Sequence, residues 1–167
     1  MELLEGIYTR RSVRKFTAED VSPDAVGEII HAGMWAPSGM NNQPWRFVIV
    51  RTPEMRRTLA DFTKYGMIIE GAPVAIAVFI ETAEMYNETK DHQSMGACLQ
   101  NMLLAAHAQG LGAVWLGEIL NRGGEVRAAL EVGESLELMA VIAIGHPTSD
   151  KHTSTRRPVG EVLIKEL

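Results

Sequence analysis

Cysteine is scarce in this sequence, with Cys98 the single one among 167 residues. One cysteine cannot build an internal disulfide framework or a cysteine-based zinc site, and it suits a reducing compartment. Long apolar runs are also lacking, since none approaches the roughly 20 residues that a membrane-spanning helix needs. The first eleven residues contain no apolar signal core. We therefore expect a cytoplasmic protein that is not inserted in a membrane.

Motifs of several enzyme classes are missing as well. The five histidines are scattered and form no HExxH pattern, and there is no G-x-S-x-G sequence, so metal catalysis and that type of hydrolase are not expected. The glycines at 110, 112 and 117 do not form G-x-G-x-x-G, and no P-loop exists. No nucleophile or acid–base pair stands out. If the chain is an enzyme, a bound cofactor is expected to carry the chemistry.

What is present is enough apolar sequence for one folded domain over residues 1–167, since 46% of the residues are hydrophobic. Apolar periodicity, caps and breakers predict helices at 2–10, 22–35, 53–65, 91–109 and 125–132. Short apolar runs predict strands at 45–50, 72–80, 110–118 and 137–145. Helices that alternate with strands predict an α/β or α+β layered fold around a central sheet.

Three segments carry more specific expectations. Strand 45–50 is apolar enough to be buried on both faces. Residues 81–90 are polar and without a clear period, which favours a loop or lid. Helix 91–109 is apolar nearly all round, which is typical of a domain centre or a subunit interface. The apolar end of the tail, 162–167, is expected to be buried, on this chain or on another subunit.

Positive charge gathers near both ends of an acidic chain. The formal net charge of −5 argues against a general nucleic-acid binder. The segment RRSVRKF nevertheless contains Arg10, Arg11, Arg14 and Lys15. Taken alone, this segment is most simply a solvated basic turn. A second basic pair, Arg156 and Arg157, follows in the tail.

The connection APSGMNNQPWRF, residues 36–47, is the other unusual segment. Ser, Asn, Gly and Pro are ordinary turn residues, so a long surface loop is the simplest interpretation. Neutral amides and hydroxyls beside a strand also suit one wall of a pocket for a polar planar ligand. The sequence leaves both interpretations open at this point.

A flavin mononucleotide would use each of these features. Its phosphate needs guanidinium and hydroxyl donors, which Arg10, Ser12 and an arginine of the tail could supply. Its uracil-like edge needs neutral donors and acceptors, which Ser38 and Asn41 could offer. Arg14 is the candidate cation near N1 and O2, and the backbone N–H at Gly117 could meet N5 without blocking the flavin face.

The sequence resembles the nitroreductase family of FMN-dependent oxidoreductases, and the resemblance covers nearly the whole chain. It is carried by four segments in the family's order: RRSVRKF, APSGMNNQPWRFVIV, DHQSMGACLQNMLLAAHAQGLGAVWLG and RRPVGEVL. The resemblance implies an α+β fold with a central mixed or antiparallel sheet flanked by helices. It also implies an intertwined homodimer with two FMN sites at the subunit interface.

The resemblance also implies roles for single residues. Those that would hold the phosphate are Arg10, Arg11, Ser12, Arg156 and Arg157. Arg14 would lie near N1 and O2 of the flavin. The main chain at Leu116 and Gly117 would meet N5. The residues that would cover the flavin from the partner subunit are Pro37, Ser38 and Asn41.

The implied activity is a ping-pong reaction in which NADH or NADPH delivers hydride through FMN N5. The acceptor would be a nitroaromatic, a quinone or a similar small molecule. Two alternatives stay open. One is a specialised enzyme of the same fold that performs reductive dehalogenation or flavin fragmentation, and the other is a flavin- or anion-binding module without turnover. A segment 81–90 that orders as a lid over its own substrate would favour the specialised enzyme, whereas a general reductase would leave the flavin face open.

Overall fold

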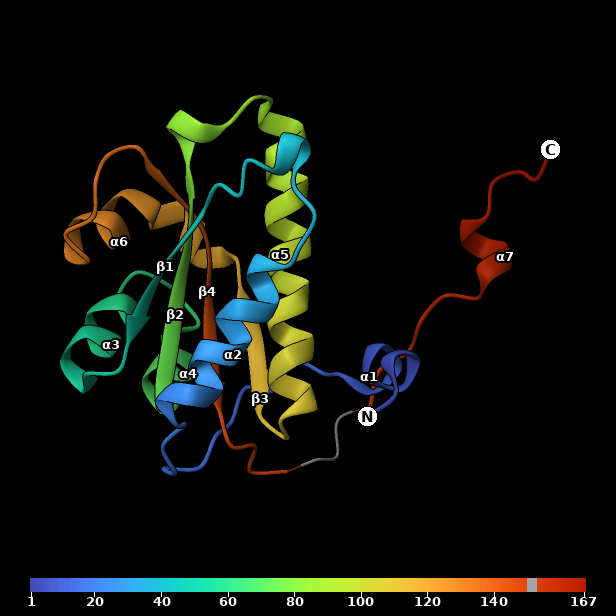
Figure 1. The fold of residues 1–167 in the computed structure, drawn as a ribbon. Helices are drawn as coiled ribbons and strands as arrows, with labels where there is room; N and C mark the ends of the chain where they lie inside the picture. The colour runs from blue at the N-terminus through green and yellow to red at the C-terminus, as the bar shows by residue number, and fades with distance from the viewer. Residues whose placement is uncertain (150–152) are drawn as a thin grey trace.

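A four-stranded antiparallel sheet forms the centre of the molecule (Figure 1). The computed structural model describes residues 1–149 and 153–167. The strand order is β1-β2-β4-β3, so β2 and β4 are central and β1 and β3 lie at the edges. The strands are β1 (Trp45–Val50), β2 (Val74–Glu81), β3 (Gly112–Leu116) and β4 (Leu136–Gly145). The α+β fold class expected from the sequence is confirmed.

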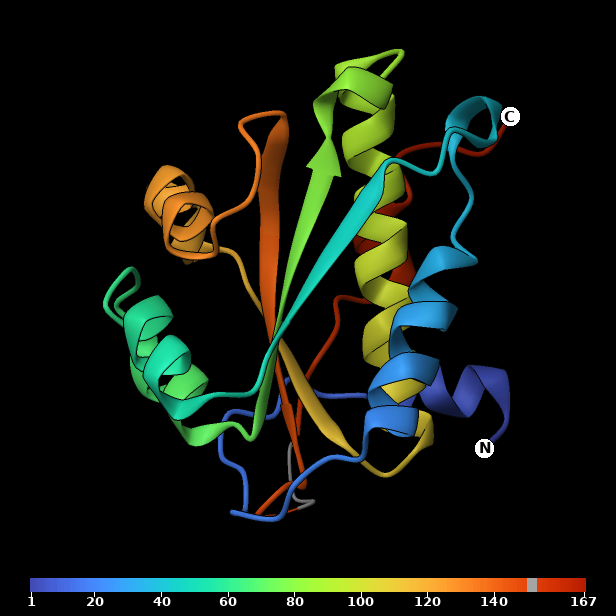
Figure 2. The same ribbon diagram turned by 60° about the vertical axis from the view of Figure 1, so that its left-hand side comes forward.

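Helices cover both faces of the sheet (Figure 2). One face packs against α2 (Pro23–Met34) and α5 (Glu88–Ala108). The other face packs against α3 (Pro53–Ala60), α4 (Gly66–Gly71) and α6 (Gly123–Ala129). Alternate side chains of each central strand therefore enter two different hydrophobic clusters, which is why β2 is buried along nearly its whole length.

Both chain ends lie outside this three-layer body. Figure 1 shows α1 (Leu3–Thr9) and α7 (Val159–Val162) beyond α5, with the last residues extending away from the sheet. Apolar side chains there are open to solvent, and Ile164 is 99% exposed. The tail is therefore not buried on its own chain, and its burial on another subunit stays a prediction.

The expectation that strand 45–50 is buried on both faces is wrong. β1 is an edge strand with one neighbour, β2, and Ile49 is 47% exposed. Ile49 pairs with Ile76 and points toward the layer of α2 and α5, which packs against Trp45 and Phe47 of β1 but does not cover Ile49. An apolar run reveals a strand but does not reveal the strand's place in the sheet.

Helix ends also differ from the expectation in places. The helix predicted at 53–65 ends at Ala60, and the chain turns before the unpredicted helix α4. Gly66 makes this turn possible, because a Cβ there would lie 2.5 Å from the carbonyl oxygen of Ala60. In the sequence, a tight turn of this kind is indicated only by its glycine.

Helix α5 begins three residues before its predicted start, at Glu88, because Asn87 caps it by accepting a hydrogen bond from the backbone N–H of Lys90 at 3.1 Å. Residues 82–84 form a single 3-10 turn, so the segment expected as a loop is partly helical. Among the helices of residues 1–149 and 153–167, none is long and apolar enough to cross a membrane.

Candidate functional site

The basic segment near the N-terminus lies beside edge strand β3. The backbone N–H of Val13 donates to the carbonyl of Ala113 at 3.1 Å, and Ser12 forms an isolated parallel bridge with Ala113. Gly112 allows this close approach, since a Cβ there would lie 2.6 Å from the Val13 side chain. The strand thus holds the arginines in place from a distant part of the sequence.

The arginines converge on a polar cavity of about 250 Å³, where the tail joins them. The residues lining it are Arg10, Arg11, Ser12, Arg14, Thr153, Ser154 and Arg156. Burial and the nearby charges of Arg11 and Arg156 lower the pKa of Arg10 from its ordinary value. Like charges held this close favour an anion among them.

Two buried nitrogens of this cluster lack a partner. Nε of Arg10 and Nε of Arg11 are both inaccessible and form no hydrogen bond within the described residues. Buried donors are normally satisfied, so a pair of unsatisfied guanidinium nitrogens at one cavity is unusual. An anion with several oxygen acceptors, such as a phosphate monoester, fits this set of donors.

Of the other basic residues predicted to bind the cofactor, Arg14 is assigned to N1 and O2, and Arg156 and Arg157 to the phosphate. Arg14 donates to the carbonyl of Ser12 at 3.3 Å, and Arg156 donates to the carbonyl of Thr155 at 2.8 Å. Both line the cavity. Arg157 is exposed and does not line it. Sequence reasoning missed Thr153 and Ser154, although the polar run before Arg156 was the available signal.

This cluster lies at the C-terminal end of α5. Oγ1 of Thr9 and Nε2 of His107 are 2.9 Å apart, which joins the end of α1 to the last turn of α5. Burial, with the charges of Arg10 and Arg11, lowers the pKa of His107 from its ordinary value. His107 is therefore favoured in its neutral form beside the arginines.

The amide-rich loop adopts an unusual backbone conformation at the opposite end of α5. Met40, Asn41 and Gln43 have positive φ angles of 54°, 57° and 49°. The loop is closed by the hydroxyl of Ser38, which accepts from the backbone N–H of Gln43 at 3.1 Å. Asn42 donates to the Asp91 carboxylate at 2.7 Å, which fixes the loop to the first turn of α5.

The two predicted parts of the site are therefore far apart in one chain. Asp91, which binds the loop, and His107, which binds the arginine segment, are 16 residues apart on α5. At 1.5 Å per residue, they are separated by about 24 Å along the helix axis. The arginines and the predicted residues Pro37, Ser38 and Asn41 do not meet within the described chain.

The loop forms part of a cavity of its own, of about 290 Å³. Pro37, Ser38 and Gly39 line it from the loop, and Tyr86 and Lys90 line it from the segment before and within the start of α5. The Lys90 ammonium lies 5.4 Å from the centre of the Tyr86 ring, within cation–π range. Sequence reasoning named this segment a lid but missed both residues.

The end of β3 carries the third predicted group. Leu116 is buried and Gly117 is exposed at the strand's end. The next residue, Glu118, accepts from the Thr63 hydroxyl at 2.6 Å and from the backbone N–H of Lys64 at 3.1 Å. The Thr63 hydrogen bond is the largest cause that lowers the pKa of Glu118. Lys64, which the sequence did not indicate, thus lies close to this strand end.

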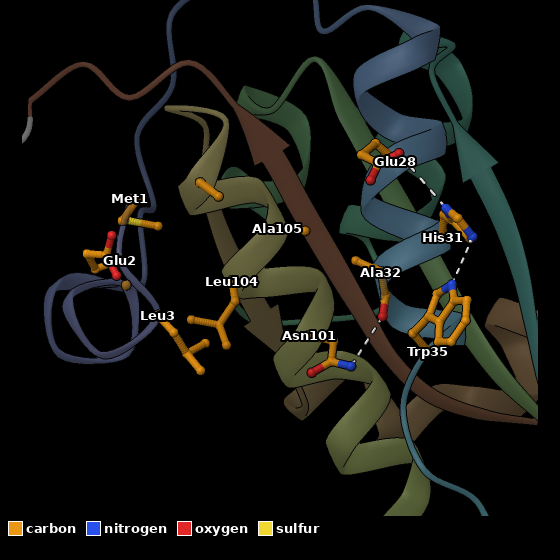
Figure 3. Close-up of a pocket in the computed structure, with 12 residues that line it drawn as sticks. Met1, Glu2, Leu3, Glu28, His31, Ala32, Trp35, Asn101, Leu104 and Ala105 are labelled. Carbon is orange, nitrogen blue, oxygen red and sulfur yellow. Dashed lines mark hydrogen bonds and ion pairs between the residues drawn. The ribbon is translucent and has the colours of Figure 1, made fainter.

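A larger and mainly apolar cavity, of about 480 Å³, contains none of the predicted site residues (Figure 3). It lies between α1, α2 and α5. Trp35, which is 78% exposed, borders it and donates through Nε1 to Nε2 of His31 at 2.9 Å. Across the cavity, Leu104 of α5 faces Leu3 of α1.

Comparison with known proteins identifies the class. The family model named Nitroreductase family matches residues 7–73 and 63–146, so the chain belongs to that family of oxidoreductases. The resemblance inferred from the sequence is confirmed.

Individual relatives agree with this assignment. A protein of Methanothermobacter thermautotrophicus, provisionally named NADH dehydrogenase/NAD(P)H nitroreductase, is 35% identical over 92% of this chain and 81% of its own length. A crystal structure from Desulfovibrio desulfuricans, provisionally named a nitroreductase in complex with FMN, is 50% identical to this chain in sequence. The two structures superpose with a TM-score of 0.93 over 98% of this chain and 96% of that one. The NADPH:FMN oxidoreductase of Vibrio harveyi, solved with NAD⁺, is 27% identical with a TM-score of 0.87 and covers 98% of this chain and 76% of its own.

Proposed function

We propose that this chain is an FMN-dependent NAD(P)H oxidoreductase whose residues 1–167 act as one flavin-binding domain. The observation that carries the proposal is the arginine cavity with the unpartnered Nε atoms of Arg10 and Arg11. Membership of the family and the FMN complex of a relative at 50% identity support FMN as the ligand. Bound FMN supplies the hydride chemistry, for which the chain offers no side-chain equivalent.

The residues of the chain bind and orient the cofactor. Arg10, Arg11, Ser12 and Arg156 hold its phosphate with charged and hydroxyl donors, and Arg157 is assigned to the same phosphate from the tail. Arg14 is assigned to N1 and O2, where a positive charge favours the reduced form. The main chain at Leu116 and Gly117 is assigned to N5, since a backbone N–H can donate there without covering the flavin face.

A homodimer completes the site. Pro37, Ser38 and Asn41 are assigned to the flavin of the partner subunit, because in one chain their loop is bound to the end of α5 opposite to the arginines. The apolar cavity between α1, α2 and α5 is assigned to the subunit interface, where a second copy would cover Leu3 and Trp35. Two such sites then form in each dimer.

The reaction follows a ping-pong order. Bound FMN would accept the hydride from NADH or NADPH and pass the electrons on, and the oxidised nucleotide would leave before the acceptor binds at the same face. The acceptor is a nitroaromatic, a quinone or a similar small molecule that takes up the electrons. The chain orients both substrates above one flavin face, and its residues 81–90 border the space where they would lie.

An absorbance experiment tests this proposal. The purified protein is loaded with FMN and one equivalent of NADH is added without oxygen. We expect the flavin band to bleach, and to return when 1,4-benzoquinone is added. Absence of FMN binding would overturn the cofactor assignment. FMN binding without bleaching by NADH or NADPH would instead indicate a flavin-binding protein without turnover.

A further inference from the structure

Asp91 is a buried carboxylate that the proposed function leaves unused. Its exposed fraction is 0%, which is unusual for an aspartate. One oxygen, Oδ1, accepts from the side-chain amide of Asn42 at 2.7 Å. The other, Oδ2, accepts from the backbone N–H groups of Tyr86 at 3.0 Å and Asn87 at 2.8 Å. One carboxylate thus joins three segments: the amide-rich loop, residues 84–87 and helix α5.

This carboxylate is ionised at neutral pH. Burial acts to raise the pKa of Asp91, but the hydrogen bonds from Asn87, Asn42 and Tyr86 and the nearby His92 hold it below its ordinary value. An ionised acceptor forms stronger hydrogen bonds than a neutral one. The three neutral donors are therefore held tightly.

Asn42 connects the Asp91 carboxylate to the amide-rich loop. Its Nδ2 donates both to Asp91 and to the backbone carbonyl of Glu84, at 3.1 Å. Its Oδ1 is buried and has no hydrogen-bond partner within residues 1–149 and 153–167, so the donor side of the amide fixes its orientation. The residues on either side, Asn41 and Gln43, both have left-handed backbone conformations, which are uncommon for non-glycine residues and more so for glutamine than for asparagine.

A second contact ties the same segments together. Arg46, which follows the loop in β1, forms an ion pair with Glu84. Glu84 is the residue whose carbonyl receives Asn42. The loop and the segment before α5 are thus joined at Asn42 and again at Arg46, which leaves little freedom for one to move without the other.

We propose that Asp91, through Asn42, is the positioning residue that sets Ser38 and Asn41 in place and couples this loop to the segment at 84–87. The inference rests on the proposed function, in which Ser38 and Asn41 cover the partner subunit's flavin and residues 81–90 border the acceptor. Asp91 touches neither the flavin nor the substrate. Its effect on the reaction is carried by the backbone of these two segments.

Two substitutions and their combination test the proposal. Asp91→Asn keeps the shape but places an amide NH₂ against donors, and Asn42→Ala removes the transmitting group. In FMN-loaded protein, each is expected to raise the FMN dissociation constant by about tenfold. The combination is expected to raise it no further than the stronger single change, because both remove one connection.

Two further measurements separate positioning from general stability. The visible absorbance and circular dichroism of bound FMN should change in both variants, because the groups covering the flavin shift. The KM for 1,4-benzoquinone should rise in both variants, while Tm, which reports folding, stays within a few degrees of the parent. Gln109→Ala is the matched control, since it removes an amide that donates to the carbonyls of Ala25 and Ala105 near the other end of α5.

The outcomes are distinct. A parent protein that binds no FMN overturns the proposed function and the inference with it. A parent that binds and turns over, with variants that are folded but unchanged in FMN affinity, spectrum and KM, overturns the inference alone. Additive effects of the two substitutions would also overturn it, because they would mean that Asp91 and Asn42 act separately. If Asp91→Asn fails to fold, Asn42→Ala still decides between these results.

Discussion

Arg10 combines a lowered pKa, a buried unpartnered Nε and two neighbouring arginines. Replacing it by alanine removes a charged donor from the assigned phosphate site. Since a hydrogen bond to a charged group contributes about 1.5–3 kcal/mol, the FMN dissociation constant should rise by roughly tenfold or more. Equilibrium dialysis measures the change.

Lys15→Ala is the control for Arg10→Ala. Lys15 is an exposed cation of the same basic segment, but it does not line the arginine cavity. We expect its removal to leave FMN affinity nearly unchanged. Equal losses in the two variants would mean that only the overall charge of the segment matters, which would contradict the assigned phosphate site.

Arg14 is assigned to a different part of the cofactor, so its removal should have a different effect. Arg14→Ala should lower the flavin midpoint potential, because a positive charge near N1 and O2 stabilises the reduced form. Its effect on FMN affinity should be smaller than that of Arg10→Ala. Potentiometric titration of the bound flavin measures this. Loss of affinity without a shift in potential would instead assign Arg14 to the phosphate, because Arg14 lines the arginine cavity.

Among the elements, those with local signals were predictable. Ser22, a typical capping residue, caps α2 by accepting from the backbone N–H of Ala25 at 3.1 Å. Gly110 follows the end of α5 with a φ of 74°. The exposed edge at Ile49 and the helix α4 were not predictable in the same way. They depend on strand order and on a backbone reversal, which nearby residues do not encode.

Gly66 and Gly71, at the two ends of α4, give a matched test of that reversal. A Cβ at position 66 would lie 2.5 Å from the Ala60 carbonyl, whereas position 71 has no atom within 4 Å. Gly66→Ala should therefore reduce the free energy of unfolding by about 1–3 kcal/mol. Gly71→Ala should leave it unchanged or increase it by about 0.4–1 kcal/mol. Urea unfolding of both variants measures the difference, and equal effects would exclude the steric explanation.

For the molecule as a whole, the apolar surface of α1 predicts self-association. Leu3 is 72% exposed and borders the cavity of Figure 3. Leu3→Glu should raise the dimer dissociation constant by roughly tenfold or more, because burial of a leucine contributes about 1.5–3 kcal/mol. Analytical ultracentrifugation measures the change.

Met67→Glu is the control for this surface. Met67 is 88% exposed but lies on α4, on the opposite side of the sheet. We expect its substitution to leave association unchanged. A dimer that resists Leu3→Glu but dissociates with Met67→Glu would place the interface on the other helical layer.

The candidate site was predictable in its residue types but not in its assembly. Residue chemistry indicated Arg10, Ser12 and an arginine of the tail, and the family resemblance pointed to Arg156. The structure gathers the three in one cavity. The sequence did not indicate Lys64 beside Glu118, or the role of Asp91, because those contacts arise between distant segments. Charged and amide side chains can be identified from the sequence. A buried acceptor such as the Asp91 carboxylate can be identified only from the three-dimensional positions of its donors.

The length of α5 between Asp91 and His107 has a genetic consequence if the dimer forms as proposed. A subunit with Arg10→Ala would still have an unaltered amide-rich loop, and a subunit with Asn41→Ala would still have unaltered arginines. Co-expression of the two defective chains should then yield mixed dimers in which one of the two sites has no altered residue. At an FMN concentration too low to fill the altered sites, the two chains would complement each other, and each mixed dimer would have about half the activity of a wild-type dimer.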